Sequence, residues 1–559
     1  GVTDVFMKAV EADGAVELTH KAEPGAKQKA AGAHQRADGL WVYRKLPAKT
    51  LWQQIMQSTY DHAEPGEDPP LERVEEVLQR ERHVGGLHGG RHRCGGRRHR
   101  RALRCQHDES RWHRARVVSG ELIGLDADVG SFSSDTRSLQ TNDVFIALSG
   151  PNFDANALVC QAAEKGAVAA VVSRMDPNAG IPQIIVSDCH RALGEIAAAW
   201  RARFPQLVRV AMTGSAGKTS TKEMTARIFE QQGETLATLG NLNNDIGVPL
   251  TLLRIREEHQ FGVFELGANH AGEIAYTSGL VQPQAAVIIN VGTAHLEGFG
   301  SRAGIAKAKG EIYDGLTPEG IAIVNIDDDF ASYWLEKLAG RRVQTFSERT
   351  VADVYATDIH AGDMPLFAFT LHIGAQSSPV QLQILGRHQV MNALAAASLA
   401  HACGISLARI VDGLQKTRAY AGRSVPHSLG HQRYVIDDSY NANPSSVKAA
   451  IDLLAALPGR HVLVLGDMGE LGDATASGHL EVGEYAAMKN IDALYATGQH
   501  SAHYAAGFGR QAQLFPDHQA LLKALEAELQ GVVTILVKGS RSARMERVVQ
   551  GLTGEVGVH

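Results

Sequence analysis

The chain has 559 residues, of which 44% are hydrophobic and 21% are charged, with a formal net charge of −6. This length predicts three or four domains of ordinary globular composition, and the charge argues against a general attraction to nucleic acids or membranes. Five scattered cysteines, no signal-peptide pattern and no apolar run near 18 residues predict a cytoplasmic protein without disulfides or membrane insertion.

Residues 1–66 contain one stretch with helical apolar spacing, from Leu51 to Met56. The runs "DGLWVYRKLPAKTLW" and "STYDHAEPG" resemble a short internal segment of the large subunit of cobalamin-dependent ribonucleotide reductases. No cysteine precedes Cys94, so the radical and redox cysteines of a reductase are missing here. We therefore expect residues 1–66 to be a reductase-like fragment without activity of its own.

Residues 67–117 include an unusual stretch, 81–117, with eleven Arg, six His and no Lys. It could be a nucleic-acid-binding arm, or Cys94, Cys105 and the histidines could bind a metal. The zinc-finger spacings are missing, and basic arms usually mix Lys with Arg. We favour a junction between unrelated sequences, and we expect the first 117 residues or so to be poorly ordered.

From Val118 onward, apolar strand-like runs alternate with helical patterns, which predicts an α/β fold. Residues 143–148, 167–173 and 182–188 are predicted strands. The stretches "ALVCQAAEKG" and "ALGEIAAAWRARF" between and after them have helical spacing. These elements predict a small α/β domain at residues 118–206.

Two further domains are predicted at residues 207–420 and 421–559. In the first, "VRVAMTG" and "QAAVIIN" are continuous apolar runs, typical of strands buried on both faces of a parallel sheet. In the second, the strand-like runs "YVIDDS", "HVLVLGD", "ALYATG" and "VTILVKG" are each followed by a helical stretch, as in a Rossmann-type domain.

The stretch "VRVAMTGSAGKTSTKEM" predicts a phosphate-binding loop between a strand and a helix. A general P-loop would place its first glycine at position 212, where this chain has Met212. Backbone N–H groups at the start of the helix would still point at an anion. Lys218 would reach the outer phosphates of a nucleotide, and the hydroxyl of Thr219 would bind Mg²⁺.

Two more residues follow strand-like runs and are candidate metal ligands, Glu265 and His295. Open α/β sheets bind ligands beyond the carboxyl ends of their strands, so both side chains could converge on Thr219. Mg²⁺ prefers oxygen ligands, so the histidine is better suited to a second metal or to a site that tolerates Mn²⁺.

From about residue 119 to near its end, the chain resembles the Mur ligases. The resemblance rests on "TGSAGKTST", "GNLNNDIGVP", "ELGANHAGEI", "AHLEGFGS", "AKAKGEIY", "LGRHQVMNALAAA", "DDSYNANP", "LGDMGELG" and "VKGSRSARME", in this order. It implies three domains: a small UDP-binding domain, a central P-loop ATPase-like domain and a Rossmann-like domain. The short Gly-x-x-Gly-Lys-Thr loop at Gly214 is the form that these ligases carry.

The resemblance also implies a reaction, in which ATP and Mg²⁺ drive the ligation of D-alanyl-D-alanine to UDP-N-acetylmuramoyl-tripeptide through an acyl phosphate. This step belongs to the synthesis of peptidoglycan precursors, and it implies a monomeric cytoplasmic enzyme that binds no nucleic acid. The alternatives are an amide ligase of the folylpolyglutamate synthase type, or an inactive chimeric ligase. An NTPase coupled to motion would need a Walker-B aspartate, and none is evident near the loop.

The resemblance assigns roles to individual residues. The implied ATP contacts are Gly214, Ser215, Ala216, Gly217, Lys218, Thr219, Ser220, Asn392, Arg423 and Asp438. The implied catalytic and metal-binding groups are Lys218, Thr219, Glu265, His295 and Lys309, where carbamylation would make Lys309 a carboxylate-like ligand; Lys307 is the alternative to it. The implied substrate contacts are Ser134, Asp135, Thr136, Arg137, Asn241, Asn243, Asn244, Lys538, Ser540 and Arg541.

The chain departs from the Mur ligase pattern at two places near the predicted UDP-binding edge. Asn156 stands where the family often has histidine, and an amide replaces an imidazole hydrogen bond without its charge. The Arg/His-rich stretch stands where the family usually has a short helix and strand.

Overall fold

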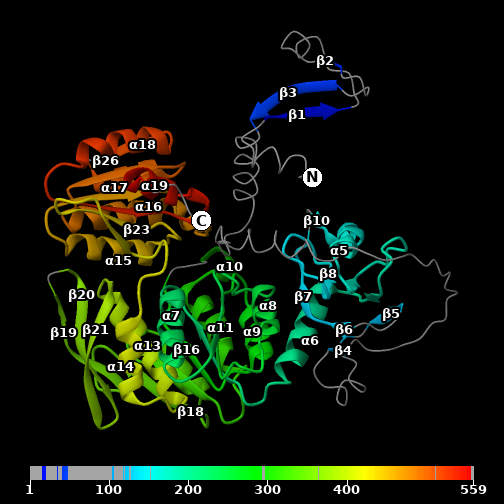
Figure 1. Cartoon of the computed structure of the whole chain (residues 1–559). Coiled ribbons are helices and arrows are strands. Elements are labelled where there is room, and N and C mark those ends of the chain that lie inside the picture. Colours follow the sequence, from blue (N-terminus) through cyan, green and yellow to red (C-terminus); the bar gives the residue numbers. More distant parts are fainter. Residues whose placement is uncertain are drawn as a thin grey trace. The chain divides into compact units, whose positions relative to one another are not determined.

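The computed structural model describes residues 15–20, 34–35, 41–47, 104–105, 118, 120–124, 128–150, 153–292, 296–362, 364–509 and 512–554. The chain divides into two compact units, residues 1–90 and residues 91–556. Figure 1 labels many of the elements of both units.

In the first unit, three strands form an antiparallel sheet in the order β1 (Ala15–His20), β3 (Trp41–Pro47) and β2 (His34–Gln35). The predicted helix from Leu51 to Met56 lies outside the described residues. The predicted disorder of residues 67–117 also lies outside them, except at Arg104–Cys105, which form the short strand β4.

The second unit begins with a five-stranded sheet in the order β5-β12-β11-β8-β7. Its strands are β5 (Glu121–Ile123), β7 (Ser131–Ser133), β8 (Asp143–Ile146), β11 (Ala169–Val172) and β12 (Gln183–Ile185). All neighbours are parallel except β5, which runs antiparallel to β12 at one edge. The helices are α5 (Val159–Glu164) and α6 (Cys189–Arg201), which confirms the predicted α/β pattern.

A nine-stranded sheet forms the centre of the same unit, in the order β14-β15-β13-β16-β17-β18-β19-β20-β21. Its parallel strands are β13 (Val208–Thr213), β14 (Thr235–Ala237), β15 (Phe261–Glu265), β16 (Ala285–Ile288), β17 (Ile321–Asn325), β18 (Arg342–Ser347) and β19 (Val354–Ala361). Its helices are α7 (Lys218–Glu230), α8 (Gly247–Leu253), α9 (Glu273–Val281), α10 (Leu296–Phe299), α11 (Arg302–Gly310), α12 (Ala331–Lys337), α13 (His388–Ala402) and α14 (Leu407–Lys416).

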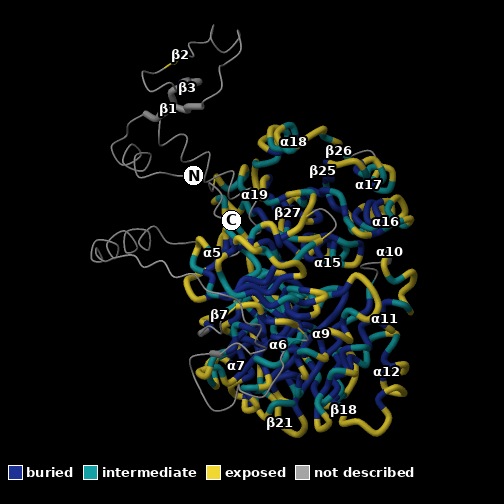
Figure 2. Tube along the Cα trace, turned by 90° about the vertical axis from the view of Figure 1, so that its right-hand side faces the viewer, coloured by how far each residue is buried: buried dark blue, intermediate teal, exposed yellow. Residues whose placement is uncertain are grey.

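The alternation of side chains along β13 explains its continuous apolar sequence. Val210 and Met212 belong to a buried cluster that includes residues of α7, α13 and α14, whereas Ala211 belongs to the cluster on the other face. Because both faces of this strand are covered, its central residues are apolar, and the polar residues Arg209 and Thr213 lie near its ends. Figure 2 shows buried residues, in dark blue, inside the unit and exposed residues, in yellow, on turns at its rim.

Two strands at one edge of the central sheet were not anticipated from the sequence. β20 (Leu366–Ile373) and β21 (Gln376–Leu385) extend it as antiparallel hairpins beyond β19. The turn between them holds only two residues and begins at Gly374, whose φ of +57° lies in the left-handed region that glycine adopts easily. The interior of β20 alternates between partly and fully buried residues, the pattern of a half-covered sheet.

The last part of the unit has a six-stranded sheet in the order β22-β23-β27-β24-β25-β26. Its strands are β22 (Val425–Ser428), β23 (Arg433–Asp438), β24 (Arg460–Leu465), β25 (Ala493–Thr497), β26 (Ala512–Phe515) and β27 (Val533–Lys538). Its helices are α15 (Pro444–Ala455), α16 (Thr475–Met488), α17 (Ser501–Phe508), α18 (His518–Leu525) and α19 (Glu546–Thr553). Apart from the antiparallel edge strand β22, the sheet is parallel, as the sequence predicts for a Rossmann-like domain.

A single hydrophobic cluster joins residues 118–206 to one face of the central sheet. It contains Leu193 and Ile196 of α6 together with Val248 and Leu252 of α8. The indole N–H of Trp200 also donates to the carbonyl oxygen of Ile255, at 3.0 Å. This apolar core crosses the predicted domain boundary between residues 206 and 207, so that boundary stays a prediction.

A buried histidine, His479, fixes the loop after β24. Its Nε2 accepts the N–H of Met468 at 3.1 Å, and its Nδ1 donates to the carbonyl oxygen of Thr475 at 2.7 Å, so the bonded ring is neutral. Burial lowers the pKa of His479; His500 and His503 lower it further, while the bond to Thr475 and the charge of Asp467 raise it.

We expect this histidine to make the protein less stable in mild acid. Below pH 6.5 or so, where a free imidazole titrates, the unfolded chain takes up a proton that folded His479 resists. The free energy of unfolding should therefore fall as the pH drops from about 6.5 towards the lower pKa of the folded state, by at most about 1.4 kcal/mol per pH unit. Denaturant unfolding between about pH 5 and about pH 8, on both sides of the reference pKa of about 6.5, measures this slope. The slope should be shallower in His479→Gln and unchanged in a variant of the exposed His431; equal slopes in all three proteins would contradict the assignment.

Candidate active site

The phosphate-loop sequence forms a tight turn between β13 and α7. Gly217 is the N-cap of α7 and has a φ of +80°, in the region that favours glycine. A Cβ at this position would collide with the amide oxygen of Asn392 on α13. The loop thus needs a glycine here for its own conformation and for the close approach of α13.

Asn290, two residues after β16, holds the same loop from the neighbouring strand. Its side-chain oxygen accepts the N–H of Ala216 at 2.9 Å, and its carbonyl oxygen accepts the N–H of Ser215 at 3.1 Å. Its amide group also donates to the carbonyl oxygen of Ala216 at 3.1 Å. Asn290 was not predicted from the sequence, although its place just beyond a strand next to β13 was a usable signal.

Lys218, the first residue of α7, is partly buried, and its Nζ donates to the carbonyl oxygen of Gly214 at 3.0 Å. Burial lowers the pKa of Lys218, and the charge of Glu265 offsets part of this effect. The ammonium group is thus held over the turn, within electrostatic reach of a buried carboxylate.

Thr219 and Glu265, both predicted metal ligands, lie together. The Thr219 hydroxyl donates to one carboxylate oxygen of Glu265 at 3.0 Å, and the side-chain amide of Asn243 donates to the other at 2.8 Å. Glu265 ends β15 and is only 2% exposed. Buried oxygen atoms at the carboxyl ends of adjacent strands form a donor set that fits Mg²⁺.

Of the other predicted metal ligands, Lys309 is buried on α11, with 1% exposure, whereas His295 lies outside the described residues. Burial, together with the like charge of Lys218, lowers the pKa of Lys309 well below its ordinary value. The alternative, Lys307, is exposed on the same helix. Within the described residues, no group of three or more His, Cys, Asp and Glu side chains could hold a metal ion by itself.

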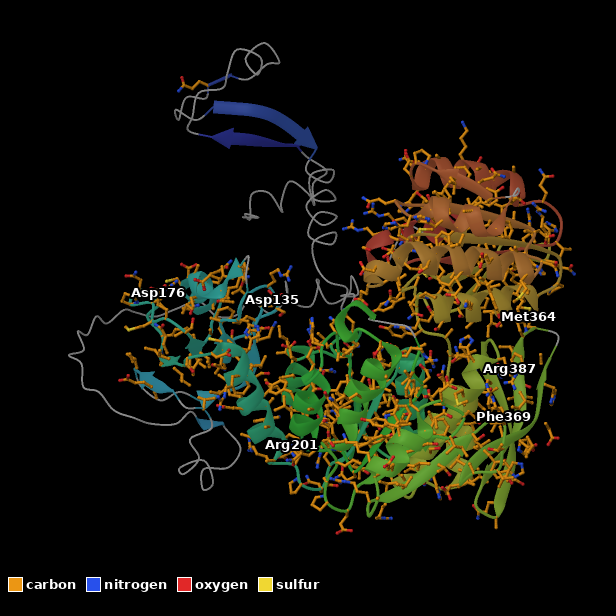
Figure 3. All side chains as sticks on the ribbon, turned by 180° about the vertical axis from the view of Figure 1, so that it is seen from behind. Asp135, Asp176, Arg201, Met364, Phe369 and Arg387 are labelled. Atoms are coloured by element: carbon orange, nitrogen blue, oxygen red, sulfur yellow. The ribbon has the colours of Figure 1, made fainter. Side chains whose placement is uncertain are left out.

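A pocket of about 420 Å³ lies beside the phosphate loop. Seven residues that the sequence analysis singled out line it: Ala216, Gly217, Ser220, Asn392, Arg423, Asp438 and Lys538. The other lining residues were not predicted from the sequence, among them Asn290, Glu348, Arg387, His388 and Asp452. Arg387, labelled in Figure 3, forms an ion pair with Glu348 at 2.8 Å across one side of this pocket. The pocket is thus built by the central sheet and by the Rossmann-like part together.

Asp438 and Lys538 form a nearly buried ion pair, with 2.6 Å between Nζ and a carboxylate oxygen. The other carboxylate oxygen of Asp438 accepts the backbone N–H of Ser424 at 3.0 Å. Lys538 was predicted to bind the second substrate, but its ammonium group also donates to the carbonyl oxygen of Asn441 at 2.8 Å. The structure therefore places Lys538 in the pocket as a partner of Asp438.

Arg423, which lines the pocket, lies over the ring of Tyr440, with its guanidinium carbon 4.4 Å from the ring centroid. The predicted substrate contact Arg541 is about half exposed and lies 5.8 Å from the same centroid. Ser540 is buried, and its hydroxyl pairs with that of Ser542 at 3.0 Å.

The predicted substrate residues in the first α/β sheet form a local network. The guanidinium of Arg137 binds the carboxylate of Asp135 through two nitrogens, at 3.0 and 2.7 Å, and lowers the pKa of that carboxyl. The hydroxyl of Thr136 pairs with Gln161 at 3.4 Å, and Ser134 is partly buried. Asp135 is labelled in Figure 3. Part of the Arg137 charge is therefore already compensated within this turn.

Asn156 connects the loop before α5 to the end of β11. Its amide donates to Asp154 at 2.7 Å and to Ser173 at 2.9 Å, while its oxygen accepts the N–H of Ser173 at 3.1 Å and that of Arg174 at 3.3 Å. These hydrogen bonds use both the donor and the acceptor of the side-chain amide, which explains how asparagine is accommodated here.

The three predicted asparagines before α8 have different surroundings. Asn243 contacts Glu265, as described above, whereas the side-chain oxygen of Asn244 accepts the N–H of Gly247 at the start of α8, at 2.8 Å. Asn241 is exposed. Only Asn243 of these three is brought to the phosphate-loop site by a hydrogen bond to one of its residues.

Comparisons with known families match most of residues 91–556. The model of the Mur ligase middle domain matches residues 212–400, and that of the Mur ligase glutamate ligase domain matches residues 423–541. The chain is 48% identical to UDP-N-acetylmuramoyl-tripeptide–D-alanyl-D-alanine ligase of Escherichia coli (strain K12), over 78% of this chain and 96% of the relative. It is 41% identical to the ligase of the same name from Haemophilus influenzae, over 79% and 98%.

Solved structures agree with the sequence relatives. A crystal structure of MurF from Acinetobacter baumannii matches with a TM-score of 0.75 and 39% identity, over 78% of this chain and 97% of that chain. MurF ligase from Thermotoga maritima in complex with ADP matches with a TM-score of 0.69 and 26% identity, over 76% and 97%. Folylpolyglutamate synthase of Mycobacterium tuberculosis, at 14% identity and a TM-score of 0.54, shares the fold alone.

Proposed function

Because this chain belongs to the Mur ligase family, we propose that it joins D-alanyl-D-alanine to UDP-N-acetylmuramoyl-tripeptide with the energy of ATP, in the synthesis of peptidoglycan precursors. The structural support for this proposal is the arrangement of the site residues. The phosphate loop, the Thr219–Glu265 pair and the pocket with Arg423 and Asp438 all belong to one continuous site.

The pocket suits a nucleotide whose phosphates lie at the loop. Backbone N–H groups at the start of α7 and the ammonium of Lys218 would bind the phosphates. Asn392, Arg423 and Asp438, which also line the pocket, would bind the adenine and ribose end of the nucleotide. ADP in the Thermotoga maritima relative supports ATP as the nucleotide.

The first chemical step would be attack of the tripeptide carboxylate on the γ-phosphate of ATP, which forms an acyl phosphate and releases ADP. Three anionic groups must approach one another, so the protein acts mainly by positioning them and neutralising their charge. Lys218 supplies one positive charge. Mg²⁺, when bound, would neutralise phosphate oxygens, and the buried oxygens of Thr219 and Glu265 are the groups that would hold it.

In the second step, the amine of D-alanyl-D-alanine attacks the acyl carbon and phosphate leaves. The exposed guanidinium of Arg541 can bind the dipeptide carboxylate through two nitrogens. Lys538 is better assigned to holding Asp438 in place, because its ammonium group is already paired. The pocket formed with the C-terminal domain would keep water from the acyl phosphate, which hydrolyses readily.

We also propose that Lys309 is carbamylated. An amine must be uncharged to attack carbon dioxide, and both burial and the nearby charge of Lys218 favour the neutral form of Lys309. The reaction consumes the amine and carbon dioxide, gives a carbamate and releases one proton. The product is an anion that compensates Lys218 and resembles a carboxylate metal ligand.

The proposed function predicts that phosphate release requires both substrates. Purified protein with ATP and UDP-N-acetylmuramoyl-tripeptide should release phosphate steadily only when D-alanyl-D-alanine is added, because only the amine turns over the acyl phosphate. Phosphate detection, with mass spectrometry of the pentapeptide product, measures this. L-alanyl-L-alanine is the matched control. A folded protein that binds ADP but shows no dipeptide-dependent release would refute the function.

The alternatives have less support. The likeness to folylpolyglutamate synthase is confined to the fold. For the chain to be an inactive chimeric ligase, its first 117 residues would have to abolish the activity of the rest. We place the reaction in the cytoplasm, where ATP is available; in the described part of the chain, no helix has the length and apolar character to cross a membrane. A monomeric state, the absence of nucleic-acid binding and the reductase-like origin of residues 1–66 stay predictions.

A further inference from the structure

Tyr440, in the turn between β23 and α15, contacts two arginines from different segments. The guanidinium carbon of Arg423 lies 4.4 Å from its ring centroid, and that of Arg541 lies 5.8 Å from it. Both distances fall within the range of about 6 Å in which a cation is attracted to an aromatic face. Arg423 precedes β22 and Arg541 follows β27, and both positions lie at the edge of the sheet where β23 ends, so this one ring contacts two separate chain segments there.

The backbone around Tyr440 is tied down on both sides. Its N–H donates to the carbonyl oxygen of Gly422 at 3.1 Å, and the N–H of Gly422 donates to the carboxylate of Asp437 at 3.2 Å. The next carbonyl oxygen, that of Asn441, accepts from Lys538 at 2.8 Å. Gly422 has a φ of +72°, and a Cβ there would lie 3.0 Å from the Cβ of Tyr440. The ring therefore projects from a fixed turn.

The two arginines retain hydrogen-bonding capacity for ligands. Arg423 lines the nucleotide pocket, and its buried Nε has no hydrogen-bond partner among the described residues. The side chain of Arg541 is 52% exposed, and the carboxylate of Glu546 is 3.9 Å away, too far for a hydrogen bond. The contact with the ring is thus the interaction that both guanidiniums share.

We propose that Tyr440 is a positioning residue that directs Arg423 to the nucleotide and Arg541 to the carboxylate of the incoming dipeptide. The identity of the dipeptide rests on the proposed function. A long, flexible arginine loses rotamer entropy when it binds a ligand, and a ring that orients it beforehand reduces this cost. Because one ring orients both side chains, its loss should weaken both binding sites together.

The test compares Tyr440→Leu, which removes the ring, with Tyr440→Phe, which removes only the hydroxyl. We expect Tyr440→Leu to raise the Kd for ADP and the KM for D-alanyl-D-alanine, each about three- to thirtyfold, as loss of a cation–aromatic contact implies. Tyr440→Phe should stay within about twofold of the parent protein for both constants, since the aromatic face remains. Calorimetry with ADP and phosphate release at varied dipeptide concentration measure them.

Trp200 provides a matched control, because its ring also contacts two arginines, Arg203 at 4.7 Å and Arg256 at 5.9 Å, away from the pocket. Trp200→Leu should lower the thermal unfolding temperature and leave the ADP Kd and the dipeptide KM unchanged. If Tyr440→Leu does not fold, Tyr440→Met, which fills similar space without a ring, replaces it.

An unchanged Kd for ADP or an unchanged KM for the dipeptide in Tyr440→Leu would overturn the proposal. So would a Tyr440→Phe protein whose Kd and KM rise as much as those of Tyr440→Leu, because the effect would then belong to the hydroxyl. ADP calorimetry needs no amide formation, so it tests the Arg423 side even if ligation fails. A parent protein without dipeptide-dependent phosphate release would instead refute the proposed function.

Discussion

Replacing Lys218 by alanine should lower kcat for ligation about a thousandfold, since removing one preorganised charge from a buried site costs about 10²–10³ in rate. Lys218 begins α7 and its ammonium group lies over the loop that would hold the phosphates. Phosphate release at saturating substrates measures the effect.

The fold of the Lys218→Ala protein should be intact. The hydrogen bond of its ammonium group in the structure goes to the carbonyl oxygen of Gly214, and burial already disfavours its charge. We therefore expect little change in the thermal unfolding temperature and weaker binding of ADP. The exposed Lys307→Ala is the control and should keep normal kcat. Near-normal turnover in Lys218→Ala would remove the phosphate-loop assignment.

The second large effect is expected at Lys309. Lys309→Ala should lower kcat by about 10²–10³-fold, because a carbamate there would both hold a cation and compensate Lys218. Acetate or propionate should restore part of the activity, since a small carboxylate can occupy the space that the side chain leaves. The rate at increasing acetate concentration measures the rescue.

The adjacent Lys307 gives a sharp control, because it is exposed on the same helix while Lys309 is buried. Lys307→Ala should keep normal activity and gain nothing from acetate. NMR with ¹³C-bicarbonate should show a carbamate signal in the parent protein that disappears in Lys309→Ala alone. A Lys309→Ala protein with normal kcat, or a signal that persists in it, would contradict carbamylation.

Much of the fold could be predicted because the central strands are covered on both faces. The continuous apolar run around Met212 favours a buried parallel strand, and the glycines after it favour a tight turn, in which Gly217 has a positive φ. The same rule, that strands end beside the site, correctly placed Glu265 near Thr219. The hairpins β20 and β21 were missed because their pairing is set by neighbours distant in sequence.

Asn290 could have been found from its place just after β16, but the rest of the pocket could not be found in the sequence for a physical reason. Arg387 and Glu348 lie 2.8 Å apart in the fold although the three strands β19, β20 and β21 separate them in the chain. No periodicity links such residues, since loops and the sheet bring them together. Lys538 was likewise predicted to be a substrate contact, because a sequence does not show that Asp438 lies within 2.6 Å of it.

The contact between Gly217 and Asn392 also limits which substitutions these two positions can accept. A side chain added at position 217 would meet the amide oxygen of Asn392 and would have to adopt a left-handed backbone, whereas a longer residue at position 392 would press on the loop. The constraint on position 217 is therefore the stronger one. A smaller residue at position 392 would remove the contact, but the left-handed backbone at position 217 would still favour glycine.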